Sequence, residues 1–149
     1  MPLRWIFAAL HLIGLGIGMG GAWGRGRALR GALDTPGLRR VFAADNWWGL
    51  SALLLIGTGV ARLLMGLEKD TRYYLQSDAF WAKMAMLGLI LALEIWPAVT
   101  LVRWRRAVAR GVQPNTSSAR RMALISELQA LILVAMVFAA TAMARGLFV

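Results

Sequence analysis

Residues 80–102 read FWAKMAMLGLILALEIWPAVTLV, an apolar run that contains two ionisable side chains, Lys83 and Glu94. Its length is close to the roughly 20 residues that an α-helix needs to cross a hydrocarbon core of about 30 Å. Because lipid offers the backbone no hydrogen-bond partner, such a run must be helical inside a bilayer. The stretch therefore predicts a transmembrane helix.

Three other runs have the same character, at about residues 5–23, 47–65 and 122–144. Together the four runs predict an all-α, four-helix transmembrane bundle, with residues 1–149 forming a single integral membrane domain. The composition agrees, because 59% of the residues are apolar and 16% are charged. The first run is long and ends in Trp23, so we expect a retained helix and not a cleaved signal peptide.

Capping signals predict helices that extend beyond these spans. Asp34 followed by Pro36 indicates that the second helix begins well before its apolar run. The other signals are Ser77 or Asp78 at the start of the third helix, Gly111 at its end, and Gly146 at the end of the fourth.

Positive charge gathers between the apolar runs. The first connection is expected to hold Arg25, Arg27, Arg30, Arg39 and Arg40, and the third Arg103, Arg105, Arg106, Arg110, Arg120 and Arg121. The second has Lys69 and Arg72 against Glu68, Asp70 and Asp78. The positive-inside rule then predicts a plasma (inner) membrane protein with both termini outside. We expect the bilayer and anionic lipids at the cytoplasmic face as partners, and no nucleic acid.

Aromatic residues flank the runs and are expected at the two membrane interfaces. The outer set is Trp5, Tyr73, Tyr74 and Trp81, and the inner set is Trp23, Trp47, Trp48 and Trp104.

Ionisable residues inside or beside the runs should face the bundle interior or an interface, because each costs roughly 2.5–3.5 kcal/mol at a helix centre. His11, Arg62 and Lys83 belong to the outer half. Asp45, Glu94 and Glu127 belong to the inner half, where we expect a buried polar network. We expect Glu94 and Glu127 to pair with arginine or polar groups of neighbouring helices. The alternative is that these carboxylates relay protons.

Two glycine stripes follow His11 in the first run. Gly14, Gly18 and Gly21 form one, and Gly16, Gly20 and Gly24 form the other. Small residues at this spacing let a second helix approach closely. The sharper hypothesis is a flat groove beside Gly14 and Gly18 that accepts a planar ring such as haem, with His11 as axial ligand and Lys83 near a propionate.

Several segments resemble an uncharacterised family of predicted membrane proteins, domain of unknown function 2214, and the resemblance covers nearly the whole chain. The segments are Leu10-His11-Leu12, ADNWWGL at 44–50, GLEK at 66–69, Tyr73-Tyr74, FWAKM at 80–84, LEIWP at 93–97 and AMARG at 142–146. More distantly, the chain is similar to four-helix haem-b protoporphyrinogen oxidases and copper-resistance D domains. That similarity rests on His11 and Lys83 and implies haem b as cofactor, although Glu94 stands where the oxidase pattern has another histidine.

Three functions remain open at this point. The first is a haem-binding or redox-linked membrane protein, with His11 as the metal ligand and with Gly14, Gly18 and Lys83 around the ring. The second is a non-enzymatic membrane scaffold or subunit that assembles through its glycine stripes, with a homo-oligomer as one form. The third is a proton or ion pathway in an oligomer. Catalytic residues are not identified, and the absence of cysteine excludes disulfides and thiol catalysis.

Overall fold

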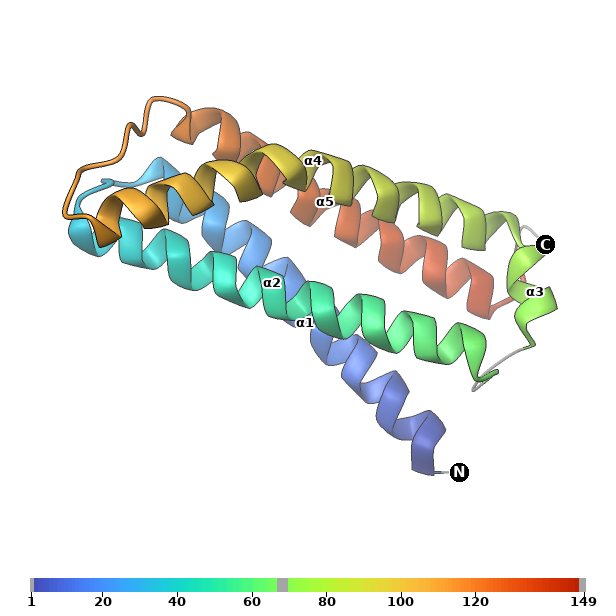
Figure 1. The fold of residues 1–149 in the computed structure, drawn as a ribbon. Helices are drawn as coiled ribbons and strands as arrows, with labels where there is room; N and C mark the ends of the chain where they lie inside the picture. The colour runs from blue at the N-terminus through green and yellow to red at the C-terminus, as the bar shows by residue number, and fades with distance from the viewer. Residues whose placement is uncertain (1, 67–69, 148–149) are drawn as a thin grey trace.

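The computed structural model describes residues 2–66 and 70–147. Its helices are α1 (Pro2–Arg30), α2 (Thr35–Leu64), α3 (Thr71–Leu75), α4 (Asp78–Ala109) and α5 (Ala119–Ala144). The four long helices lie together as a bundle, and the short α3 sits in the connection from α2 to α4 (Figure 1). Each long helix is long and apolar enough to cross a membrane. The predicted four-helix transmembrane bundle is therefore confirmed.

The helix boundaries follow from the predicted capping residues. The Asp34 side chain accepts a hydrogen bond of 2.9 Å from the Gly37 N–H, which satisfies a free donor in the first turn of α2. Ser77 caps α4 in the same way through the Phe80 N–H. Gly111 and Gly146 follow the ends of α4 and α5 with φ of 72° and 69°, a left-handed conformation that glycine adopts without strain.

The first connection is shorter than the sequence predicted. Helix α1 continues to Arg30, so Arg25 and Arg27 lie within the helix, and residues 31–34 alone link it to α2. Arginine is a good helix former, and the charge clusters therefore continue the helices instead of ending them. The second connection contains α3, which was not predicted, while Glu68 and Lys69 lie outside the described residues.

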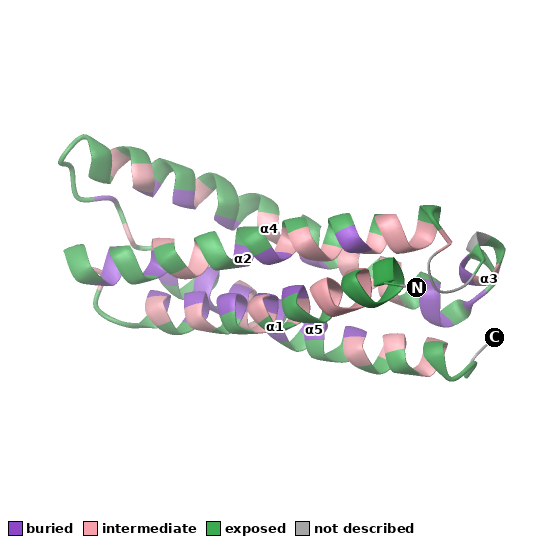
Figure 2. Ribbon diagram, turned by 90° about the horizontal axis from the view of Figure 1, so that it is seen from below, coloured by how far each residue is buried: buried purple, intermediate pink, exposed green. Residues whose placement is uncertain are grey.

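The core consists of two apolar clusters spaced along the bundle. Helix α1 packs mainly on α2 and α5, and α4 packs on α5. One cluster, near the 31–34 link, comprises Leu29, Leu38, Val41, Leu101, Trp104, Ala119, Met122 and Ala123. The other comprises Ala22, Trp48, Ile90, Ala130, Ile132, Leu133 and Met136. Figure 2 shows buried positions recurring along the long helices between exposed ones, as expected for helices with one face inward.

Many large apolar side chains remain exposed, as a lipid-facing surface requires. Leu53 is 75% exposed and Phe138 is 72% exposed. Trp5, Trp23, Trp47 and Trp81 are also exposed. In contrast, Trp48, Trp104 and Tyr74 are buried, so these three aromatic residues pack inside the protein and do not form the expected interface belt.

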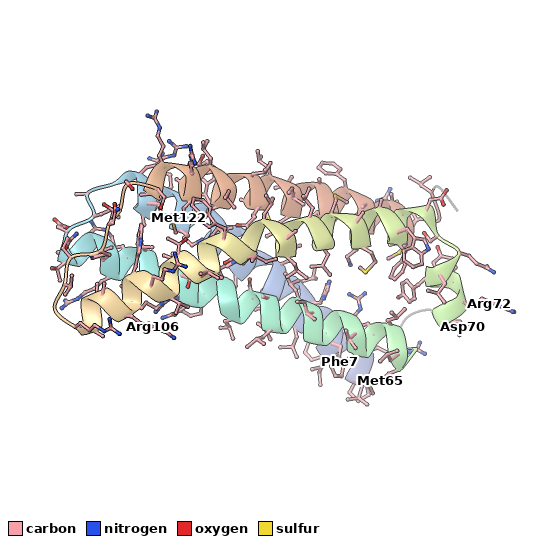
Figure 3. The ribbon with its side chains drawn as sticks, turned by 45° about the horizontal axis from the view of Figure 1, so that its top comes forward. Phe7, Met65, Asp70, Arg72, Arg106 and Met122 are labelled. Atoms are coloured by element: carbon pink, nitrogen blue, oxygen red, sulfur yellow. The ribbon has the colours of Figure 1, made fainter. Side chains whose placement is uncertain are left out.

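The bundle has two chemically different ends. Figure 3 shows Arg106 and Met122 toward the end that carries the links 31–34 and 110–118. Phe7, Met65, Asp70 and Arg72 lie toward the opposite end, to which both chain termini also belong (Figures 1 and 3). Most of the arginines lie beside these two links, at the adjoining ends of α1, α2, α4 and α5, so we call this end the basic end.

Candidate functional site

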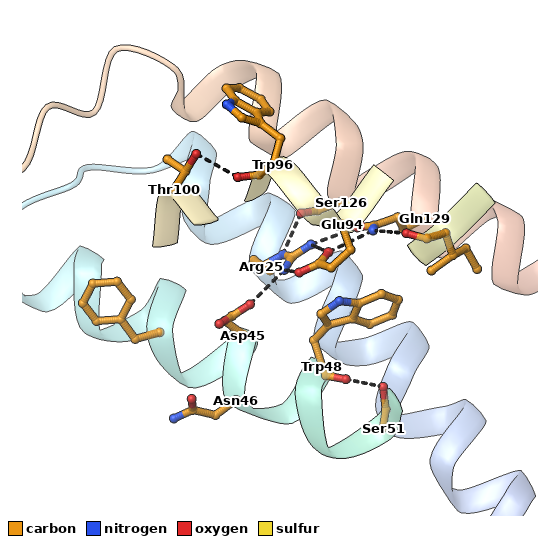
Figure 4. A network of polar contacts seen from close by, with 12 residues as sticks. Arg25, Asp45, Asn46, Trp48, Ser51, Glu94, Trp96, Thr100, Ser126 and Gln129 are labelled. Atoms are coloured by element: carbon orange, nitrogen blue, oxygen red, sulfur yellow. Dashed lines mark hydrogen bonds and ion pairs between the residues drawn. The ribbon is translucent and has the colours of Figure 1, made fainter. Parts of the chain in front are cut away.

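A single arginine joins all four long helices. The Arg25 side chain, from α1, is fully buried. Its Nε donates a hydrogen bond of 2.8 Å to the Ser126 hydroxyl on α5 (Figure 4). Its two terminal nitrogens reach carboxylates on α2 and α4, which places the guanidinium at the meeting point of the bundle.

Two carboxylates neutralise the buried guanidinium. Glu94 binds it in bidentate fashion, with Nη1 to Oε1 and Nη2 to Oε2 both at 2.8 Å. Asp45 accepts a further bond of 2.8 Å from Nη1. Planar, charge-assisted pairs of this kind are among the strongest hydrogen bonds in proteins.

A second arginine balances the charge. Arg105 on α4 donates from Nη2 to the other Asp45 oxygen at 3.0 Å and to the Asn46 side chain at 3.0 Å. The same nitrogen also donates to the Phe42 carbonyl at 3.2 Å. Two arginines thus face two carboxylates, and the group carries no net formal charge.

Neutral groups complete the hydrogen bonding. The Gln129 carbonyl accepts from Arg25 at 2.9 Å, while its amide donates to Glu94 at 2.9 Å and to the Ile90 carbonyl at 3.2 Å. The Arg25 guanidinium carbon also lies 5.7 Å from the centre of the Trp48 ring, a cation–π distance. We call Arg25, Asp45, Glu94, Arg105, Ser126 and Gln129 the Arg25 network.

Arg25 and the side chains that bond to it directly lie between the two apolar clusters. On α1, Arg25 falls between Ala22 and Leu29, which belong to different clusters. On α4, Glu94 likewise falls between Ile90 and Leu101. Low polarity on both sides strengthens the hydrogen bonds and makes the loss of any partner costly.

The three predicted acidic residues separate into two groups. Asp45 and Glu94 share Arg25, whereas Glu127 pairs with Arg30 on α1 at 2.6 Å and 2.9 Å. The expected ion pairs of Glu94 and Glu127 are therefore present, but they are separate interactions. The Arg30 side chain is 34% exposed, so water screens the second pair more strongly than the first.

Sequence reasoning missed the residue at the centre. Arg25 was assigned to the first connection with its neighbouring arginines, and Ser126 and Gln129 were not considered. One signal was available, because Ser126 and Gln129 are three residues apart in an apolar run and so share a helix face. Nothing in the sequence distinguishes Arg25 from Arg27, which is exposed.

His11 makes an interhelical hydrogen bond. Its Nδ1 lies 2.7 Å from the hydroxyl of Thr58 on α2. The Thr58 hydroxyl also lies within hydrogen-bond distance of the Leu54 carbonyl of its own helix. Lys83 is half-buried on α4, in the half of the bundle away from the basic end.

The first glycine stripe is used for packing inside the chain. A Cβ on Gly14 would lie 3.0 Å from the Leu54 Cβ, and one on Gly18 would lie 3.1 Å from the Ser51 Oγ. At Gly21 it would approach the Trp48 backbone nitrogen to 2.9 Å. Helix α2 thus fills the space beside Gly14 and Gly18, and no planar ring fits between them and α2.

Comparison with known proteins places the chain among predicted membrane proteins. The model of a family described as "Predicted membrane protein (DUF2214)" matches residues 3–147. No curated protein and no solved structure gives a significant match. The distant similarity to haem-b oxidases and copper-resistance D domains therefore stays an expectation.

Proposed function

We propose that this protein, which belongs to the DUF2214 family of predicted membrane proteins, is a non-enzymatic structural module of the membrane, a small scaffold or subunit. The observation that carries the proposal is the Arg25 network, in which one buried guanidinium bonds to side chains of the other three long helices. Such a centre fixes the relative positions of the helices, and it leaves the lipid-facing side chains free to bind other membrane proteins.

The ion pairs favour this role over a proton pathway. Glu94 and Glu127 each bind an arginine through both carboxylate oxygens. Both oxygens of each carboxylate are thus occupied by an arginine, and such bidentate pairs are geometrically specific. The same pairs are well suited to hold helices together.

Site-specific photo-crosslinking in native membranes tests the scaffold role. A diazirine analogue of leucine at Leu53 or Leu131, which are 75% and 63% exposed, should form adducts of discrete mass with another membrane protein. Leu133 is 2% exposed and lies on the same helix as Leu131, so it is the matched control and should form none. Adducts with lipid alone at both exposed positions would contradict the proposal.

A second candidate is haem b bound through His11, and the Thr58 contact supports it. Metal-binding histidines commonly form a hydrogen bond through their other ring nitrogen, and the contact of Nδ1 with Thr58 fits this pattern. His11 would be the axial ligand, and Lys83 is the residue proposed to contact a propionate. Haem would supply a redox-active iron. Helix α2 packs against Gly14 and Gly18, which argues against a haem ring in the groove predicted beside these glycines. A haem would therefore have to approach His11 from another side.

Absorption spectroscopy decides between the two candidates. The scaffold proposal expects purified protein from a haem-supplemented culture to show no Soret band. If haem is bound, the band should disappear in His11→Ala and persist in Arg27→Gln, a change at an exposed residue of the same helix. A colourless parent protein would contradict the haem candidate, and a His11-dependent band would contradict a purely structural role.

The proposed location is the plasma (inner) membrane, with both termini outside. The arginines on the helix ends at the basic end support this orientation, because Arg and Lys are in excess near the cytoplasmic ends of membrane spans.

A further inference from the structure

A groove on the outside of the bundle runs between α1 and α2. Its volume is about 750 Å³, within the range of pockets that hold small molecules. From α1 it is lined by Ile17, Gly20, Gly21, Gly24, Arg27 and Ala28, and from α2 by Arg40, Ala43, Ala44 and Trp47. Arg25 does not line it, so the groove is distinct from the Arg25 network.

Small residues create this groove. A Cβ on Gly20 would meet no atom within 4 Å, and one on Gly24 would have Ala44 as its nearest contact at 3.9 Å. The second glycine stripe is therefore not used for packing within the chain at Gly20. Trp47, which is 55% exposed, lines the α2 side.

The groove has one charged end. Arg27 and Arg40 come from different helices, and both are exposed. Within the described residues neither side chain forms an ion pair or a hydrogen bond, and Glu127 attracts Arg27 only from beyond ion-pair distance. The other lining residues are apolar, so the groove offers two cations at one end and an apolar surface along the rest.

The length of the groove matches the thickness of one leaflet of a bilayer. Ile17 and Arg27 are ten residues apart on one helix, which corresponds to about 15 Å. Half of a hydrocarbon core is also about 15 Å. An occupant whose charged group meets the arginines would thus extend its apolar part to the middle of the membrane.

We propose that this groove is a binding site for a phospholipid with an anionic headgroup, with the headgroup at Arg27 and Arg40 and an acyl chain along the glycines. A second copy of the chain fits less well, because a two-fold contact through this face would bring the arginines of both copies together. A soluble anion would leave the apolar part of the groove uncovered.

Native mass spectrometry of the full chain tests the proposal, with phosphatidylglycerol and phosphatidylcholine of identical acyl chains as probes. The parent should retain phosphatidylglycerol preferentially. Arg27→Gln combined with Arg40→Gln should reduce that preference about 30-fold, since each arginine near an anionic lipid contributes roughly a fivefold factor. Arg39→Gln combined with Arg106→Gln removes the same charge from exposed positions outside the groove and should have little effect.

A groove-filling variant separates lipid from a soluble anion. Gly20→Leu keeps both arginines and places a side chain in open space, so the fold should persist while lipid retention falls. Glycerol 3-phosphate, which has no acyl chain, should not compete. Equal retention of phosphatidylcholine, equal loss in the Arg39/Arg106 variant, unchanged retention in Gly20→Leu, or competition by glycerol 3-phosphate would each overturn the proposal. A dimer that Gly20→Leu dissociates would also overturn it and assign the groove to a second copy.

Discussion

Arg25 and Arg27 are two residues apart on one helix, yet they lie in opposite environments. Arg25 is fully buried with five side-chain hydrogen bonds, whereas Arg27 is exposed at the end of a lipid-facing groove. Two residues correspond to about 200° around an α-helix, so the two side chains leave nearly opposite faces. The same residue type therefore stabilises the bundle in one position and contributes to a binding surface in the other.

Removing the Arg25 guanidinium should be strongly destabilising. In Arg25→Gln, Asp45 and Glu94 lose their shared cation, and breaking a buried ion pair from one side costs on the order of 3 kcal/mol. Arg27→Gln is the matched control and should change the free energy of unfolding by less than about 0.5 kcal/mol. Unfolding by SDS in mixed micelles measures both. Equal midpoints for the two variants would show that the Arg25 network does not hold the bundle.

Helix α1 presents its two glycine stripes to different surroundings. Gly14, Gly18 and Gly21 face α2 in antiparallel register, at Leu54, Ser51 and Trp48 respectively. Gly16 and Gly20 face open space. Gly14, Gly18 and Gly21 allow α2 to approach α1 closely. Gly21 lies one turn before Arg25 on α1, so this close approach also positions Arg25.

Substitution by alanine should therefore affect the stability of the protein differently at the neighbouring positions Gly20 and Gly21. In Gly21→Ala the new Cβ would lie 2.9 Å from the Trp48 backbone nitrogen, so the helices must separate. Overpacking of this kind costs about 1–3 kcal/mol. Gly20→Ala meets nothing within 4 Å and should be neutral or slightly stabilising, because alanine favours the helix. The same SDS titration compares them, and a larger loss in Gly20→Ala would contradict the packing argument.

At the scale of the whole molecule, the ends of the bundle differ in charge. The basic end carries the arginine-rich parts of α1, α2, α4 and α5 and the links 31–34 and 110–118. The charge that was expected in loops thus lies mostly on helix ends. The positive-inside rule counts charges near the ends of the spans, so it applies in the same way.

Reporter fusions check the resulting orientation. Fusions at Arg30 and Ala107 should give a cytoplasmic signal, and a fusion at Tyr74 an external one, because the arginine-rich ends of the four long helices all lie at one end of the bundle. An external signal at Arg30 would reverse the topology. Substituting several of the arginines at the basic ends of α1 and α2 by glutamine should weaken the orientation preference, which provides an internal control.

The number of spans, the helical class and most helix boundaries can be predicted from the sequence. Each of these depends on local properties: the length of an apolar run, a capping side chain such as Asp34, or a glycine such as Gly111 with positive φ. It also predicted that Glu94 and Glu127 would be paired, because an isolated charge is costly in hydrocarbon whatever the fold.

Which arginine is buried, and which glycine stripe packs against another helix, depends on the three-dimensional arrangement of the helices. Both depend on how far α1 is rotated about its axis against α2 and α5, and no local pattern fixes that rotation. Arg25 and Arg27 are chemically identical, as are Gly20 and Gly21, so their roles differ only through the neighbours that the other helices bring to them. The Arg25 network exists because four helices place complementary charges at one depth, a condition that a linear sequence does not display.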